Sequence, residues 1–304
     1  MSNQFFFSIV IPTYNRANDL ERCLNSLVKQ TYRDFEVLIC DDGSTDHTKD
    51  VVGKFSDKLT LKYLYNENSG GPAGPRNLGI KNANGEWICL LDSDDWCTSD
   101  KLEYIYNLNL KNIDFIYHKL ISIDRNGVKD TMFTRQINNK RQVIDLLTRF
   151  NPILTSSACI KKTIFIENDL SFSENKKIVG VEDFDMWIRM AHAGVRFKMV
   201  SKNLGFYRKE GLDSISYGDE RQVARLHEVY SSYQHILSPK NQKKSLAAFS
   251  YQKAVLLLGN NDKSESLKNL VLAMKNGVVY IKLKALIRIV KLKLLTKRSL
   301  IDLG

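Results

Sequence analysis

The first hundred residues alternate between short apolar runs and segments with helical periodicity, and this alternation restricts the possible fold more than any other feature. Four of the apolar runs are long enough for buried strands: FFFSIVI, FEVLIC, LKYLY and WICLL. Strands that are apolar along their whole length are typical of parallel sheets covered on both faces, and the helical segments between them supply the covers. The sequence therefore predicts an α/β fold with a doubly wound, mostly parallel sheet.

The pattern changes in the later part of the chain. VEDFDMWIRMAHAG predicts a helix, and VRFKMVSKNLGFYRK predicts an extended strand. From about Asp219 onward almost every segment has helical periodicity. We therefore expect an α/β domain over residues 1–215 and a helical region over residues 216–304.

The cysteines and the first residues indicate a reducing compartment. The five cysteines are odd in number, fit no C-x-x-C spacing and mostly lie within apolar runs. MSNQFFFSIVIPTYNR has no basic leader, long apolar core or small-residue cleavage site. No apolar stretch reaches the length of about 18 residues that a membrane-spanning helix needs. We therefore expect a cytoplasmic protein.

The net charge of +11 suggests either nucleic acid or an anionic membrane as a partner. Residues 276–304 hold seven Lys/Arg and one acid, so this segment alone contributes +6. No recognition-helix or RNA-binding signature is present, and the acidic loops described next would repel a polyanion. We expect no nucleic-acid partner, and a basic nucleic-acid-binding protein is kept only as an alternative function.

A polar loop follows each apolar run, and the four loops are PTYN, DDGSTD, NENSGGPAG and DSDD. The carboxyl ends of parallel strands lie at one edge of a sheet, so these loops are expected to lie together. Turn formation is the commonest use of Asp, Asn and Gly. It does not explain three carboxylates directly after a buried strand, because they repel one another unless a cation is bound.

Asp92 and Asp94 therefore predict a site for Mg²⁺ or Mn²⁺. Such ions bind through one or two carboxylates together with a substrate phosphate, which implies a diphosphate-bearing substrate. The chain has no G-x-x-x-x-G-K-[ST] and no G-x-G-x-x-G, so those two kinds of phosphate loop are excluded.

Five segments in this order resemble the family 2 glycosyltransferases, which are inverting enzymes of the GT-A fold. The segments are SIVIPTYNR, DFEVLICDDGSTD, GGPAGPRNLGI, GEWICLLDSDDW and VEDFDMWIRM. They span about residues 5–210 and leave the C-terminal third uncovered. The resemblance implies a GT-A domain with a nucleotide-sugar half over residues 1–100 and an acceptor half over residues 101–215.

The resemblance also implies roles for particular residues. A UDP-sugar would be held by Thr13, Asn15, Asp41, Asp92, Ser93 and Asp94, with Mn²⁺ or Mg²⁺ on Asp94, while Asp183 would be the catalytic base with Glu182 beside it. The chemistry agrees, because a carboxylate can take the proton of an acceptor hydroxyl as the new bond forms. From the residues alone, Asp183 is equally well an acid favoured by the dipole at a helix N-terminus.

The sequence departs from the family pattern in one place. Members often carry a basic-x-His motif after the acceptor half, and here FYRKEGLDSIS has Glu210 where the histidine would stand. The roles of Arg208 and Glu210 therefore stay open. Arg76 in GPRN could approach a phosphate, although a solvated or structural arginine is the favoured interpretation.

We expect a hexosyl- or N-acetylhexosaminyltransferase that moves a sugar, with inversion, from a UDP-sugar to a hydroxyl of a glycan. The expected acceptor is a lipid-linked oligosaccharide or a surface polysaccharide precursor. A sugar-phosphate nucleotidyltransferase is the alternative enzyme. The glycine-rich nucleotide loop of that class is absent from IVIPTYNRAND.

The basic segment of residues 278–304 predicts peripheral attachment to an anionic membrane surface, on the inner face of the membrane. In VVYIKLKALIRIVKLKLLTKR aliphatic and basic residues interleave, and lysines can reach the headgroups while Ile281, Ile289 and Leu292 insert. A terminal helix packed on the domain is the alternative. We favour the membrane because an enzyme that extends a lipid-linked glycan gains from lying where its acceptor is anchored.

Overall fold

A computed structural model describes the chain except for residues 1–4, 125, 210–219, 260–261 and 302–304. The described residues form two compact units. The α/β unit comprises Met1–Asn139 and Pro152–Asp213, and the helical unit comprises Lys140–Asn151 and Ser214–Gly304. The helical unit thus includes a short segment that precedes the expected boundary at residue 215.

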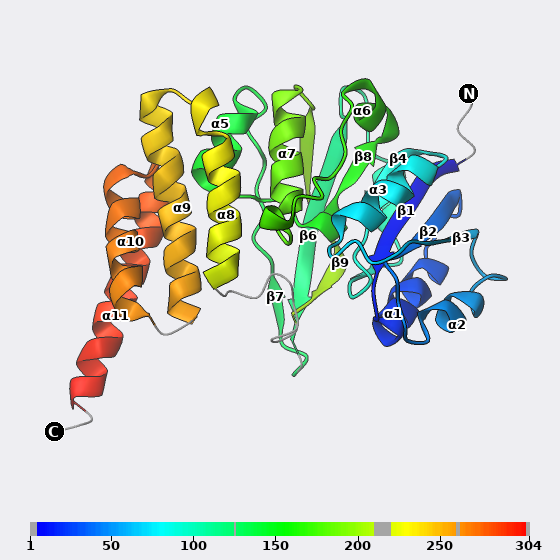
Figure 1. Ribbon diagram of the computed structural model, residues 1–304, viewed down its shortest axis with the longest axis horizontal. Helices are drawn as coiled ribbons and strands as arrows, with labels where there is room; N and C mark the ends of the chain where they lie inside the picture. Colours follow the sequence, from blue (N-terminus) through cyan, green and yellow to red (C-terminus); the bar gives the residue numbers. More distant parts are fainter. Residues whose placement is uncertain (1–4, 125, 210–219, 260–261, 302–304) are drawn as a thin grey trace. The chain divides into compact units, whose positions relative to one another are not determined.

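The first four strands of the α/β unit are parallel neighbours, as the four apolar runs predict (Figure 1). They are β1 (Phe5–Thr13), β2 (Phe35–Asp41), β3 (Leu61–Tyr65) and β4 (Gly85–Leu90), in the spatial order β3-β2-β1-β4. Because all four run in one direction, their carboxyl ends share one edge of the sheet.

The rest of the sheet is mixed. β8 (Cys159–Lys161) is antiparallel to both β4 and β6 (Phe115–Ile123), and β6 is parallel to β9 (Phe197–Arg208). β5 (Trp96–Cys97) pairs antiparallel with β9, and β7 (Lys129–Thr131) forms a hairpin with β6. The sheet therefore continues from the expected nucleotide-sugar half into the expected acceptor half.

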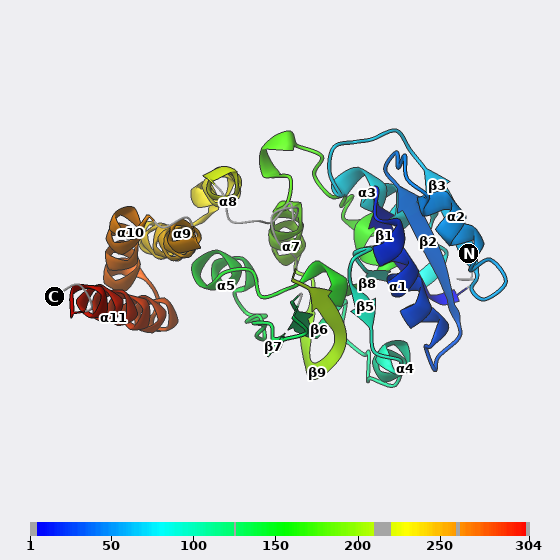
Figure 2. The ribbon, with the colours of Figure 1, turned by 90° about the horizontal axis from the view of Figure 1, so that it is seen from below.

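Helices cover both faces of the parallel strands (Figure 2). α1 (Ala17–Val28) and α2 (Thr48–Gly53) pack on the face that holds Phe7, Ile9 and Ile11. α3 (Ala73–Asn82) packs on the opposite face so closely that a Cβ on Gly79 would lie 2.4 Å from Cγ1 of Val10. The remaining helical elements of this unit are α4 (Lys101–Tyr106), η1 (Thr155–Ser157), α6 (Lys162–Glu167), η2 (Lys176–Ile178) and α7 (Glu182–His192).

The helical unit has its own core. Its elements are α5 (Gln142–Arg149), α8 (Glu220–Ser232), η3 (Gln234–Ile236), α9 (Pro239–Gly259), α10 (Lys263–Asn276) and α11 (Val279–Ile301). The rings of Phe150 and Tyr251 stack with centroids 5.2 Å apart, and Ile281 of α11 is fully buried. Helical periodicity predicted this region correctly.

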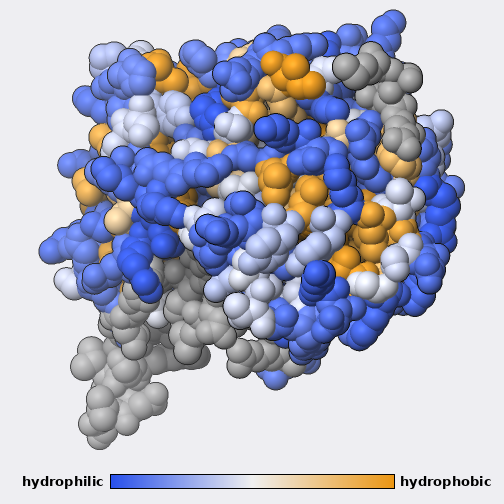
Figure 3. All heavy atoms as spheres, turned by 45° about the vertical axis from the view of Figure 1, so that its right-hand side comes forward, coloured by the Kyte–Doolittle hydropathy of each residue, from blue (hydrophilic) through white to orange (hydrophobic). Residues whose placement is uncertain are grey.

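Hydrophilic side chains cover most of the face drawn in Figure 3, and the hydrophobic ones form separate groups between them. The strand residues that look most apolar in the sequence, such as Trp87 and Leu90, are fully buried. Among the helices that the structure describes, none is long and apolar enough to cross a bilayer.

Candidate functional site

The carboxyl edge of the parallel strands brings the polar loops together, as the sequence predicts. Thr13 ends β1, Asp41 ends β2, and Asp92 follows β4. Thr13 is 3% exposed, and its hydroxyl has no hydrogen-bond partner among the residues that the structure describes. An unpartnered buried hydroxyl at this edge is a candidate contact for a ligand.

Asn15 organises the second polar loop. Its φ of +50° is a left-handed conformation that asparagine tolerates. Its Oδ1 accepts hydrogen bonds from the backbone N–H groups of Thr45, at 2.8 Å, and Asp46, at 3.3 Å. Its own N–H donates to Oγ of Ser44 at 2.8 Å. The side-chain carbonyl of Asn15 is therefore engaged in shaping DDGSTD.

Both oxygens of Asp41 also have partners. Oδ1 accepts from the Ser44 N–H at 2.8 Å, and Oδ2 accepts from the Tyr63 hydroxyl at 2.6 Å. Burial and the bond to Asp41 raise the pKa of Tyr63, so the hydroxyl stays a donor at neutral pH. The neighbouring Asp42 accepts from the Ser69 N–H at 2.8 Å. Sequence reasoning missed Tyr63 and Asp42, which fix the loops around Asp41.

Arg76 of α3 is a buried bridge between two carboxylates. Its side chain is 4% exposed, and its guanidinium lies 2.7 Å from Oδ1 of Asp92 and 2.6 Å from Oε1 of Glu182. Burial alone would lower the pKa of Arg76, but the charges of Asp92 and Glu182 outweigh burial and raise it. These two ion pairs give Arg76 a structural role, which is the interpretation favoured in the sequence analysis. Glu182 also accepts a hydrogen bond from the Gly180 N–H, so its carboxylate holds both Arg76 and the loop before α7.

A second bridge, through η1, joins the loop after β4, which holds Asp92, to the start of α7, which holds Asp183. Oγ of Ser156 accepts from the Asp92 N–H at 3.0 Å, and the hydroxyl of Thr155 donates to Oδ2 of Asp183 at 3.2 Å. The buried Lys101 donates to the Ser156 carbonyl oxygen at 3.0 Å and so holds η1 in place. No motif in the sequence marks Thr155 or Ser156, so sequence reasoning could not find them.

Asp183 lies in the first turn of α7 and is half-buried. Its Oδ1 accepts from the Phe184 N–H at 2.7 Å. Burial, and then the negative charge of Glu182, raise the pKa of Asp183 to about 7, although Arg76 acts in the opposite direction. A carboxylate with a pKa near neutrality can accept a proton from a hydroxyl and release it again.

The acidic cluster after β4 is only partly exposed. The Asp94 carboxylate, 34% exposed, lies 3.8 Å from the Arg16 guanidinium, and Ser93 beside it is buried. Burial and the charge of Asp92 raise the pKa of Asp94. Asp95 is fully buried and accepts from the Arg208 N–H at 3.0 Å.

These residues fit a divalent cation. A bound cation would relieve the repulsion between Asp92 and Asp94, and Mg²⁺ or Mn²⁺ needs only one or two protein carboxylates when a diphosphate supplies other ligands. Within the described ranges, no group of three or more His, Cys, Asp or Glu forms a complete protein cage. The Arg208 guanidinium pairs with Asp19, and Glu210 lies outside the described residues.

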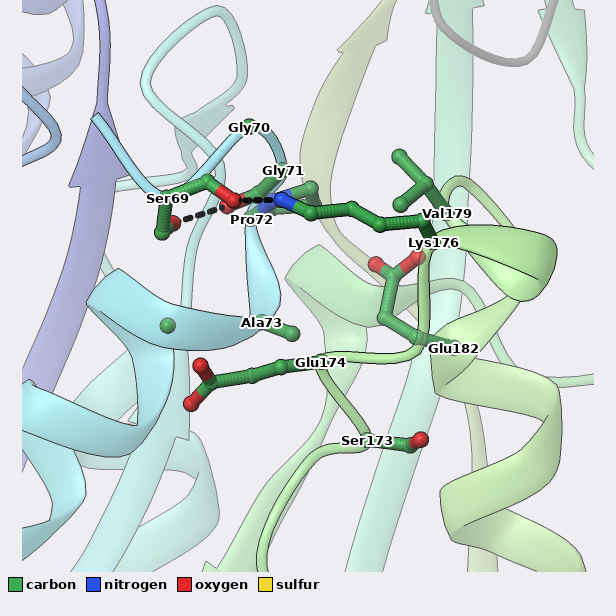
Figure 4. Close-up of a pocket in the computed structure, with 11 residues that line it drawn as sticks. Ser69, Gly70, Gly71, Pro72, Ala73, Ser173, Glu174, Lys176, Val179 and Glu182 are labelled. Atoms are coloured by element: carbon green, nitrogen blue, oxygen red, sulfur yellow. Dashed lines mark hydrogen bonds between the residues drawn. The ribbon is translucent and has the colours of Figure 1, made fainter.

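A narrow pocket opens beside this network (Figure 4). The loop Ser69–Gly74 forms one wall, while Glu174, Lys176 and Glu182 come from the other side. The Lys176 ammonium group donates to the Ser69 carbonyl oxygen across the pocket. A Cβ on Gly74 would lie 2.7 Å from Oγ and 2.9 Å from Cβ of Ser69, so a larger residue there would displace the Ser69 side chain. Lys176 was not among the predicted site residues.

Comparisons with known proteins place these features in context. A family model described as "Glycosyl transferase family 2" matches residues 8–167. The poly(ribitol-phosphate) beta-N-acetylglucosaminyltransferase TarS of Staphylococcus aureus (strain MW2) is 34% identical over 184 residues, which are 59% of this chain but only 32% of the relative. The UDP-Glc:alpha-D-GlcNAc-diphosphoundecaprenol beta-1,3-glucosyltransferase WfgD of Escherichia coli is 32% identical over 187 residues, 61% of this chain and 70% of the relative.

Solved structures show the same fold. S. aureus TarS 1-349 in complex with UDP-GlcNAc superposes with a TM-score of 0.65 at 24% identity, covering 90% of this chain and 82% of that one. A mannosyltransferase from Pyrobaculum calidifontis, in complex with GDP-Man and Mn²⁺, superposes with a TM-score of 0.60 at 17% identity, covering 99% and 81%. The predicted GT-A fold with a helical C-terminal region is confirmed.

Proposed function

The chain belongs to glycosyl transferase family 2, and from that premise we propose that it transfers a sugar from a UDP-sugar, with inversion, to a hydroxyl of a glycan. The family model spans more than half of the chain, so the resemblance of the sequence motifs is confirmed. TarS and WfgD are named for transfer of N-acetylglucosamine and glucose. These names support a UDP-hexose or UDP-N-acetylhexosamine as the donor.

One observation carries the mechanistic proposal: two separate bridges connect Asp92, at the donor loop, to Asp183, the proposed base. Arg76 pairs with Asp92 and with Glu182, the residue before Asp183. Residues Thr155 and Ser156 bond to Asp183 and Asp92 respectively. Support of this kind holds the base at a fixed distance and orientation from the donor site, which catalysis by positioning requires.

In the proposed reaction Asp183 accepts the proton of the acceptor hydroxyl while the hydroxyl oxygen attacks the anomeric carbon. Attack from the face opposite the diphosphate inverts the configuration. A divalent cation held by Asp94, with Asp92 beside it, would supply neutralisation of the charge on the departing UDP. Arg76 holds Asp92 and Glu182 in place, and the raised pKa of Asp183 suits a base that works near neutral pH.

The acceptor proposal follows the relatives. WfgD is named for a diphosphoundecaprenol-linked acceptor and TarS for a poly(ribitol-phosphate) acceptor. We therefore propose a polysaccharide or lipid-linked glycan precursor as acceptor, and an anionic membrane surface as the place of reaction.

Thermal unfolding with candidate donors tests the donor and the cation together. At a donor concentration about 100 times its Kd, binding should raise the melting temperature by roughly 5 °C or more. We expect UDP-GlcNAc or UDP-Glc to give this rise with Mn²⁺ and a much smaller one in EDTA. The Asp94→Asn variant should lose the Mn²⁺-dependent part of the rise in melting temperature and nearly all turnover. The control is Asp100→Asn, at an acid paired with Lys202, and this variant should keep the thermal shift and the turnover. Full activity in EDTA would rule out the cation.

The pH profile tests the base. Because the pKa of Asp183 is raised to about 7, its carboxylate is protonated and inactive as a base below that pH. We expect kcat/KM to rise with pH and to level off above about 7. Thr155→Val removes a hydrogen bond that favours the ionised form, so the rise should move to higher pH. A profile that is flat from pH 5 to 8 in both proteins would exclude Asp183 as the titrating base.

A further inference from the structure

Where the side chains of helix α11 are described, from Val279 to Leu294 except residue 293, the helix presents two apolar faces, and only one of them is covered. Ile281, Ala285 and Ile289 are buried inside the helical unit, so the expectation that Ile281 and Ile289 insert into a membrane is wrong. A different set of six apolar side chains on the same helix is between 46% and 74% exposed. These are Val279, Leu283, Leu286, Ile287, Val290 and Leu294.

The exposed residues form one continuous stripe. Successive residues of a helix turn by about 100°, so the six side chains fall within an arc of about 100°, roughly opposite the buried face. Lys282 and Lys291, both exposed, lie about 40° beyond the two edges of the stripe. The stripe thus has a cation on each side. This arrangement explains why the basic residues of the sequence fall on two faces of the helix.

The other described cations of α11 turn toward the unit. Nε of Arg288 donates to the Tyr251 hydroxyl at 2.8 Å, and the Lys284 ammonium group lies 6.0 Å from the centroid of the Phe150 ring. These two side chains support the inner packing of the helix. Lys282 and Lys291 remain at the borders of the exposed stripe.

Charge is strongly divided between the two units. The helical unit contains 19 Lys/Arg and seven Asp/Glu, a formal net charge of +12, whereas the α/β unit has a net charge of −1. Lys240, Lys243, Lys244 and Lys275 line a hollow of the helical unit that contains no acid. Within the described part of the chain these four lysines have no ion-pair partner. The helical unit therefore attracts anionic surfaces.

We propose that the outward stripe of α11, with Lys282 and Lys291 at its borders, docks on the surface of an anionic phospholipid bilayer. The apolar side chains would lie at the boundary of headgroups and acyl chains, and the lysines would reach the lipid phosphates. A second copy of the chain is a poorer occupant of this face, because two units of +12 repel each other and the flanking lysines would meet. The proposal rests on the helical unit and not on the chemistry at Asp183.

The test measures binding of the full chain to vesicles of phosphatidylcholine with and without phosphatidylglycerol. The wild type should co-sediment with the anionic vesicles, and added salt should weaken binding. The triple variant Leu283→Gln, Ile287→Gln, Val290→Gln should bind at least about tenfold more weakly, because it replaces three of the six apolar side chains of the stripe. Its donor-induced thermal shift should stay that of the wild type, so failure of docking and failure of the proposed function are separable.

A matched triple variant, Leu246→Gln, Val271→Gln, Leu272→Gln, controls for general loss of surface hydrophobicity. These residues lie on α9 and α10 and are between 42% and 49% exposed. Their replacement by glutamine leaves the net charge of the protein unchanged. The control should bind vesicles like the wild type. Equal loss in both variants would overturn the assignment to α11.

Two further measurements complete the test. If the α11 triple variant does not fold, Lys282→Glu with Lys291→Glu replaces it, and this variant should lose the preference for anionic vesicles. Sedimentation equilibrium without lipid tests whether a second copy of the chain covers the stripe of α11. A wild-type dimer that the α11 variant converts to a monomer, with vesicle binding unchanged, would show a contact between copies and would overturn the proposal.

Discussion

Asp183→Asn is expected to lower kcat by about 10²- to 10⁴-fold while the affinity for the donor stays nearly unchanged. The base acts only on the acceptor, so donor contacts are not touched. The replacement is close to isosteric: the amide oxygen can still accept from the Phe184 N–H, and the amide nitrogen can donate to the Thr155 hydroxyl. Single-turnover rates and donor titration measure the two quantities separately.

Stability distinguishes loss of the base from damage to the fold. A carboxyl whose folded pKa is raised to about 7 stabilises the native state at low pH, and this contribution is lost as the pH rises through 7. At pH 8 the ionised Asp183 carboxylate therefore lowers the free energy of unfolding, and asparagine does not. The variant should consequently melt no lower than the wild type at this pH. Asp185→Asn, two residues along α7, makes the same charge change and should remain active. A residual kcat above about a tenth of the wild-type value, a loss below about 1.4 kcal/mol, would contradict the base role.

The parallel half of the sheet and the meeting of the polar loops at its carboxyl edge were predictable from the sequence because their causes are local. An apolar run such as WICLL can be buried only as a strand or a core helix, and its short length favours a strand. Once four such strands are parallel, their carboxyl ends must meet at one edge. The cluster at Asp92 and Asp94 then marks that edge without any three-dimensional information.

The residues that organise the site were not predictable, because their partners are distant in the sequence. Arg76 and Glu182 are 106 positions apart, and neither segment shows which charge it will meet. The start of α2 is a smaller example. α2 begins only at Thr48, because the distant Asn15 accepts from the Thr45 N–H and Asp46 accepts from the Thr48 N–H.

Short strands and helix faces show a second limit. β5 and β8 contain two and three residues, too few to display any periodicity, although they complete the sheet. In α11 both faces are apolar, so the sequence could not tell which one the helical unit covers. The structure decides this by burying Ile281 and leaving Leu283 exposed.

Arg76→Met should be the most destabilising single change at the site. It leaves Glu182, with a side chain 4% exposed, as a buried charge without its countercharge. Breaking one side of a buried ion pair costs about 3–5 kcal/mol, which for a unit of this size corresponds to a fall of roughly 10 °C in melting temperature. Arg189→Met on α7 is the matched control. Its ion pair with Asp185 is more exposed, at 29% for the arginine and 13% for the aspartate, against 4% for both Arg76 and Glu182, so the loss of stability should be clearly smaller.

The second substitution shows whether the buried charge is the cause. Adding Glu182→Gln to Arg76→Met removes the unpaired carboxylate but keeps an oxygen that can accept from the Gly180 N–H, so more than half of the lost stability should return. Denaturant unfolding of both variants measures this recovery. Because Arg76 lowers the pKa of Asp183 and the Glu182 charge raises it, the acid limb of activity should move to higher pH in the single variant and back toward that of the wild type in the double. If the double variant is no more stable than the single one, lost packing of Arg76, and not the charge of Glu182, determines the effect.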